Sequence, residues 1–71
     1  MFNSLEFNAL LARNDKTKDD VAAVLGINPA TLYRKVNGQS DFTRKEIQII
    51  GKLFNLDAAT INLIFFAPEL A

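Results

Sequence analysis

Side chains that could carry out chemistry are scarce in this sequence. It contains no histidine and no cysteine among its 71 residues, which excludes most zinc sites, nearly all triad hydrolases and any disulfide framework. It also lacks a glycine-rich phosphate loop. Asp19 and Asp20 form the adjacent acidic pair, but neighbours on a helix point about 100° apart and do not suit paired-carboxylate catalysis. These residue types argue against an enzyme and predict no metal, no cofactor and no small-molecule ligand.

The remaining reactive groups are charges, and they are unevenly placed. Eight basic and eight acidic side chains give a net charge of zero. Residues 28–52 nevertheless carry five basic and two acidic side chains, for a net +3, whereas residues 1–27 carry −1 and residues 53–71 carry −2. A basic middle third is compatible with a surface that binds nucleic acid. A scattered, solvated surface explains the same charges.

The length and hydropathy of the chain indicate one small domain over residues 1–71,. Its apolar content of 49% is enough for a modest core,. The longest apolar run, residues 63–67, is far shorter than the roughly 20 residues that cross a bilayer,. Residues 1–4 lack the basic start of a signal peptide. We therefore expect a soluble, cytoplasmic protein with no membrane partner.

Helix start and stop signals recur at short intervals and predict an all-α fold of five short helices. Each expected helix is preceded by a residue that can cap it: Ser4, Thr17, Asn28, Thr43 and Asp57,. Thr17 and Thr43 each open a capping box with an acidic residue three positions later, and Pro29 suits the first position of the third helix. Turn formers end the helices at residues 13–15, Gly26, residues 37–38, Asn55 and Pro68,.

The most informative stretch runs from Lys18 to Gly38 and is typical of two helices joined by a three-residue turn. So short a turn forces the helices to cross steeply. The crossing requires a small residue at the contact, which Ala22 supplies, and a positive φ in the turn, which Gly26 adopts at little cost. The first, fourth and fifth helices must complete the core, because two helices of about eight residues are not stable alone. The apolar stripe and wedge are expected at Val21, Val24, Leu25, Ile27 and Leu32.

This stretch resembles the phage-repressor and Cro type of helix-turn-helix protein, also called lambda-repressor-like or XRE type. The resemblance is carried by Val21-Ala22-x-x-Leu25-Gly26-Ile27-Asn28-x-x-Thr31-Leu32-Tyr33-Arg34, followed by Asn37-Gly38. The five-helix layout extends it over most of the chain. The resemblance implies a compact five-helix domain with the helix-turn-helix at its second and third helices, over about residues 17–38.

Two positions depart from the pattern of that family. Lys35 stands where an apolar residue is usual. Either Val36 takes over the core contact, or the stem of Lys35 lies along the core with its ammonium in solvent. Lys18 stands where the family often has a glutamine that contacts phosphate, and it would make that contact by charge.

The resemblance implies that the helix over residues 29–36 enters the major groove of DNA with its N-terminal half foremost. The candidate base contacts are Asn28, Ala30, Thr31, Tyr33 and Arg34. The fork of Arg34 matches guanine O6 and N7, whereas Ala30 and the methyl group of Thr31 suit the thymine methyl group. The alternatives are that Tyr33 is a half-buried helix residue and that Arg34 is a solvating surface charge.

Phosphate contacts are expected from helix N-termini and from basic side chains around them. The candidates are Thr17, Lys18, Asn37, Gln39, Ser40, Thr43, Arg44 and Lys45. Cations in the first turn of a helix oppose its dipole, so Arg44 and Lys45 favour an anionic partner. Asp41 would repel phosphate, and the sequence offers no explanation for it.

The end of the chain is apolar and nearly uncharged over residues 61–70, as in a buried helix or an interface,. In the resembled family the last helix often pairs with a symmetry mate. We therefore expect a homodimer, at least on DNA, formed within residues 57–71 by Ile64, Phe65 and Phe66, with two recognition helices about one DNA turn apart. The alternative is that Ile61, Ile64 and Phe65 close the core of the single chain.

Together these features predict a sequence-specific regulator of transcription that binds a double-stranded DNA operator. It would be a repressor or Cro-like protein of phage or prophage origin that acts by covering a promoter. The alternative is a protein-interaction module of the same fold, which binds another regulator through its apolar end and has weak or no DNA binding.

Overall fold

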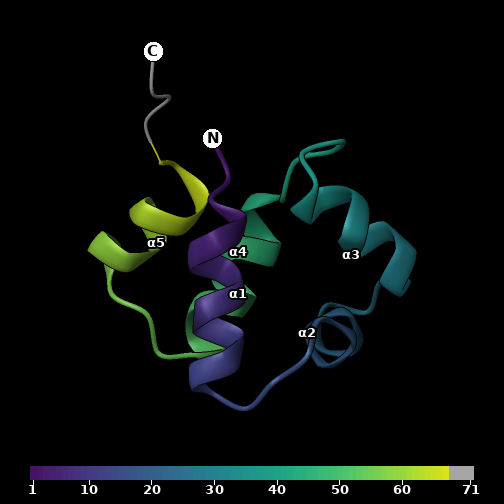
Figure 1. The fold of residues 1–71 in the computed structure, drawn as a ribbon, viewed down its shortest axis with the longest axis horizontal. Coiled ribbons are helices and arrows are strands. Elements are labelled where there is room, and N and C mark those ends of the chain that lie inside the picture. The colour runs from purple at the N-terminus through teal and green to yellow at the C-terminus, as the bar shows by residue number, and fades with distance from the viewer. Residues whose placement is uncertain (68–71) are drawn as a thin grey trace.

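Five α-helices joined by short turns make up the computed structural model, which describes residues 1–67 (Figure 1). They are α1 (Ser4–Arg13), α2 (Lys18–Leu25), α3 (Pro29–Val36), α4 (Arg44–Leu53) and α5 (Ala58–Phe65). Within these residues there is no strand, so the predicted all-α class with five helices is confirmed. None of the described helices is long and apolar enough to cross a membrane.

The helices surround one core, and their order in space differs from their order in the chain. α1 and α4 lie in the middle, α5 lies on one side of them, and α2 and α3 lie on the other (Figure 1). α2 packs on both α3 and α4, whereas α5 packs on α1 and α4. The described body is compact, with a radius of gyration of 11.3 Å. As a result, α3 is held at the edge of the molecule.

Local hydrogen bonds begin four of the helices where the sequence predicts. Thr17 and Thr43 each accept from the backbone amide three residues later, and Asp20 and Glu46 accept from the amides of these threonines, so both capping boxes are complete. The side chains of Asn28 and Asp57 cap α3 and α5,. These contacts satisfy backbone donors that a helix of eight to ten residues would otherwise leave to water.

The start of α1 differs from the prediction. Asn3, not Ser4, is the N-cap, and its side-chain oxygen accepts from the amide of Glu6 at 3.1 Å. The amide of Asn3 also donates to the carbonyl of Ile64 at 2.7 Å. This bond to the end of α5 holds Asn3 in an extended conformation, which is the backbone shape a cap requires,.

The glycine in the turn between α2 and α3 has the positive φ that the sequence predicts. Gly26 adopts a left-handed conformation with φ of 70°. The next amide, of Ile27, donates to the carbonyl of Ala22 at 3.0 Å. Val21 and Leu32 are fully buried on either side of the turn. The expected burial of Val24 is wrong, because it is 50% exposed and lies about 160° from the buried Ala22 around the helix.

Phenylalanine rings from distant parts of the chain meet in the core. Phe2, Phe7, Phe42 and Phe65 form a continuous group, with ring centroids 4.9 to 6.2 Å apart. Tilted and edge-on pairs at these distances are favourable beyond the area they bury. Phe2 and Phe42 lie outside the helices, so this cluster attaches the N-terminal segment and the loop before α4 to the helical body.

The three residues of the predicted dimer interface differ in their burial at the end of α5. Ile64 and Phe65 are buried in the core of the single chain, whereas Phe66 is 58% exposed. The first two side chains pack within the single chain, where α1 and α4 lie against α5. The alternative, in which Ile61, Ile64 and Phe65 close the intramolecular core, agrees with this packing. The expected end of the helix at Pro68 lies outside the described residues.

Candidate nucleic-acid interface

The outer face of α3 is set by what the helix buries. Leu32 has no exposed surface, and Lys35 and Val36 are also buried. Residues on the opposite side of a helix must then face solvent. Among the predicted base contacts, Thr31 is half-buried and the others are exposed, namely Asn28, Ala30, Tyr33 and Arg34. Asn37, the C-cap of α3, is exposed as well.

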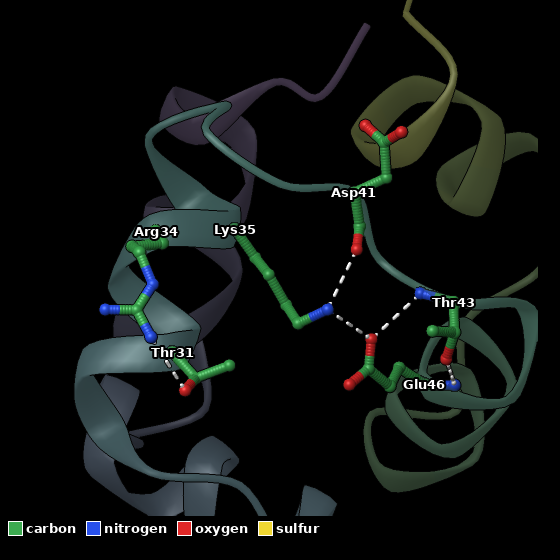
Figure 2. A network of polar contacts seen from close by, with 6 residues as sticks. All are labelled: Thr31, Arg34, Lys35, Asp41, Thr43 and Glu46. Atoms are coloured by element: carbon green, nitrogen blue, oxygen red, sulfur yellow. Dashed lines mark hydrogen bonds and ion pairs between the residues drawn. The ribbon is translucent and has the colours of Figure 1, made fainter.

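Arg34 presents a guanidinium group on this face. One of its terminal nitrogens donates to the hydroxyl of Thr31 at 3.2 Å, one turn earlier on the helix (Figure 2). The side chain points away from α4 (Figure 2). A guanidinium has five N–H donors, so this bond leaves most of them free to meet a planar pair of acceptors. The interpretation of Arg34 as a surface-exposed cation is equally consistent with its exposure.

Two other predicted base contacts already have partners within the chain. The side-chain oxygen of Asn28 accepts from the amide of Ala30 at 2.8 Å as the cap of α3. The hydroxyl of Tyr33 donates to a carboxylate oxygen of Asp19 on α2 at 3.4 Å. Tyr33 is 45% exposed. Its ring therefore lies partly over the α2–α3 junction and partly in solvent.

The predicted phosphate contacts gather at two helix N-termini and one loop. Thr17 and Lys18 are at the start of α2, with Lys18 half-buried. Thr43, Arg44 and Lys45 start α4, and all three are exposed. Neither Arg44 nor Lys45 is ion-paired with any carboxylate of residues 1–67. Exposed amides and unpaired cations at a helix start are suited to an anion.

The loop between α3 and α4 folds back onto the end of α3. The amide of Gln39 donates to the carbonyl of Arg34 at 2.8 Å, and Gly38 has a φ of 83°. This arrangement is a common way to satisfy the last carbonyls of a helix. The side chains of Asn37, Gln39 and Ser40 are thereby kept at the surface.

The side chain of Lys35 is the feature that the sequence did not predict. Its ammonium is not in solvent: it lies 3.1 Å from a carboxylate oxygen of Glu46 and donates to the carbonyl of Asp41 at 2.8 Å (Figure 2). It is also 5.9 Å from the centre of the Phe42 ring. Val36 is buried too, so the position keeps its core contact and gains a polar link. Thr43–Glu46 spacing revealed the capping box, but no local pattern pointed to Lys35 as a further partner.

The acidic groups near these cations have distinct roles. Partial burial acts to raise the pKa of Glu46, but hydrogen bonds from the Thr43 amide and from Lys35 outweigh it and hold the pKa below its ordinary value. Hydrogen bonds from the amide and hydroxyl of Thr17 lower the pKa of Asp20. Both groups are therefore carboxylates at neutral pH. Asp41 contributes its backbone carbonyl, and its own carboxylate points away from Lys35 (Figure 2).

Comparison with known proteins gives no independent identification. No family model matches the chain, and no curated protein or solved structure matches it. Its function is therefore inferred from the exposed face of α3 and from the N-termini of α2 and α4.

Proposed function

We propose that this chain is a sequence-specific double-stranded DNA-binding regulator of the phage-repressor and Cro type, with α2 and α3 as its helix-turn-helix. The observation that carries the proposal is the rotation of α3. Burial of Leu32, Lys35 and Val36 turns Ala30, Tyr33 and Arg34 outward at the edge of the molecule. A helix so placed can enter a major groove about 12 Å wide.

The exposed face of α3 has the chemistry that base recognition requires. Arg34 offers parallel donors for guanine O6 and N7. Ala30, near the N-terminus of α3, offers a methyl group that suits thymine. We expect Asn28 to act mainly as a helix cap, because its oxygen is bonded to the amide of Ala30. Tyr33 would contact a base edge or a phosphate on leaving Asp19.

Backbone contacts in this proposal come from the start of α2 and the start of α4. Lys18, Arg44 and Lys45 supply charge, and the helix N-termini supply amide donors,. Two cations at the start of α4 are unfavourable for the helix dipole by themselves. A phosphate between them would remove that cost, which supports a DNA backbone as the partner.

Regulation would follow from occupancy of the operator. A homodimer covering a promoter would exclude polymerase, and its two copies of α3 would read half-sites about one DNA turn apart. The exposed Phe66 is the part of the predicted dimer surface that is available to a second copy.

The proposal is tested by selecting binding sites from a random duplex pool at physiological salt. The wild-type protein should enrich a two-fold symmetric site. Arg34→Ala should relax the preference at one position in each half-site and weaken binding by roughly 1–3 kcal/mol, because a bidentate base contact is lost. Lys52→Ala is the matched control, since it also removes one positive charge from an exposed site, in the last turn of α4 and outside the proposed interface.

A folded protein that enriches no site would contradict the proposal. It would favour the alternative of a protein-interaction module, which the exposed Leu63 and Phe66 on and after α5 also support. Salt dependence separates the two functions. For a DNA-binding protein, the logarithm of the affinity falls linearly with the logarithm of the salt concentration, with a slope of about 0.9 per phosphate contacted.

A further inference from the structure

Lys35 joins three segments of the chain at one nitrogen atom. Among residues 1–67, Lys35 is the one charged residue that is buried, with 9% of its surface exposed. Its ammonium bonds to the Asp41 carbonyl in the loop and to Glu46 on α4, and it faces the ring of Phe42 (Figure 2). The end of α3, the loop and the first turn of α4 are thereby connected.

Glu46 extends this connection to the N-cap of α4. The same carboxylate oxygen that pairs with Lys35 accepts from the amide of Thr43 at 2.8 Å. The amide of Glu46 donates in return to the Thr43 hydroxyl at 3.1 Å. The backbone that carries Arg44 and Lys45 is therefore tied, through one carboxylate, to a side chain of α3.

The link resists rotation of α3 in a way that apolar packing does not. Arg34 and Lys35 are consecutive on the helix and point to different sides of it (Figure 2). A roll of α3 that moved Arg34 would pull the ammonium away from its carboxylate and carbonyl. Hydrophobic contact is non-directional, whereas a charged group with defined acceptors has one favourable placement.

We propose that Lys35 is a positioning residue that fixes the rotation of α3 against the first turn of α4, and so the placement of Arg34 relative to Arg44. The effect of Lys35 on DNA recognition rests on the proposed DNA-binding function. The connection between α3 and α4 rests only on the contacts of Lys35 and Glu46. Lys35 itself makes no phosphate contact, because its charge is used by Glu46.

The decisive variant is Lys35→Met, which keeps an unbranched side chain in the core and removes the ammonium. Lys52→Met is its control, because it makes the same replacement at an exposed site. Glu46→Gln is the second variant: it keeps an oxygen for the Thr43 amide and removes the charge, so the test remains possible if Lys35→Met fails to fold.

The first measurement uses no DNA. Amide hydrogen exchange should become roughly tenfold faster at Thr43 and in the loop of residues 38–42 in Lys35→Met and Glu46→Gln, with the amides of α1 unchanged. Unchanged exchange at these sites in both variants would overturn the proposed link, whatever the protein does with DNA.

The second measurement compares affinity for the selected site with affinity for an unrelated duplex. Lys35→Met should lower this ratio roughly tenfold, the scale of one mismatched base pair, with the salt slope unchanged. A slope reduced by about 0.9 with the ratio retained would instead make Lys35 a phosphate contact and overturn the proposal.

The two measurements separate the two possible failures. If the wild-type protein prefers no site but exchange responds to Lys35→Met, the proposed function fails and the link stands. If the wild-type protein is specific and Lys35→Met changes neither exchange nor the ratio, the positioning role fails and DNA binding stands.

Discussion

The ammonium of Lys35 is largely removed from water, and nearby acceptor groups compensate for its lost hydration. Desolvating a charge costs several kcal/mol, which is offset only by close, well-oriented acceptors. A carboxylate, a backbone carbonyl and an aromatic face supply them here. The stem of the lysine fills the core at a position where the resembled family carries an apolar side chain. One residue therefore serves packing and polar connection together.

The lowered pKa of Glu46 makes stability depend on pH in the acid range. A carboxyl whose pKa is lower in the folded state contributes its full stabilisation at pH values above its pKa in the unfolded chain, ordinarily 4.5,. That contribution is lost as the pH falls through the pKa of the folded state. Urea unfolding at several pH values should show the free energy of unfolding falling below about pH 5.

Glu46→Gln is the comparison that identifies the residue responsible. In this variant the free energy of unfolding should fall less steeply as the pH is lowered. The remaining decline would come from Asp20 and Asp57, whose pKa values are also lowered by hydrogen bonds. A profile as steep in the variant as in the wild type would show that Glu46 gains nothing from its partners.

At the scale of helices and turns, each start signal acts over three or four residues. That is why the sequence alone located the caps at Thr17, Asn28, Thr43 and Asp57. Asn3 was missed because a contact with Ile64, far along the chain, decides where α1 begins. The contact between Phe2 and Phe42 could not be predicted for the same reason, since both lie outside the helices and no periodic pattern relates them.

The turn at Gly26 gives a direct test of the α2–α3 arrangement. Gly26→Ala should destabilise the fold by about 1 kcal/mol, because a Cβ is unfavourable in the left-handed conformation,. Beyond the adjacent backbone, no atom of the described residues lies within 4 Å of that Cβ, so the cost is conformational and involves no clash with packed side chains. Urea denaturation measures it.

Gly26→Asn is the control for this interpretation. Asparagine adopts the left-handed conformation more readily than alanine, so its loss should be smaller. Equal stability of the alanine variant and the wild type would indicate that the turn is free to relax out of the left-handed conformation.

The same limit of local patterns applies to the candidate site. Helical periodicity around Leu32 placed the exposed residues of α3 on one face, because rotation follows from what is buried. The family resemblance gave burial of the Lys35 stem as one of two alternatives, but no pattern indicated its partner, since Glu46 lies on another helix across a loop. The sequence pattern also did not show that the side chain of Tyr33 has a hydrogen-bond partner within the chain, the Asp19 carboxylate.

At the scale of the whole molecule, two adjacent aromatic residues have different environments, one in the core and one at the surface. Phe65 packs against Phe2 and Phe42, whereas Phe66 faces outward. Phe65→Ala should cost about 3–5 kcal/mol of stability, which is most of what a domain of this size has. Phe66→Ala should change stability by under about 0.5 kcal/mol.

Sedimentation at several concentrations, with and without the selected duplex, then tests the partner surface. If Phe66 contributes to a homodimer, Phe66→Ala should weaken self-association while the monomer stays folded. A wild-type protein that remains monomeric throughout, even on DNA, would contradict the dimer.

The contact between Tyr33 and Asp19 also has a practical consequence. The chain contains one tyrosine and no tryptophan, so its ultraviolet emission comes almost entirely from the ring at the junction of α2 and α3. Departure of the hydroxyl from the carboxylate, or stacking of the ring on a base, would alter that emission. The protein therefore carries an intrinsic fluorescent reporter on the face of α3, and binding can be followed by titration without attaching a dye.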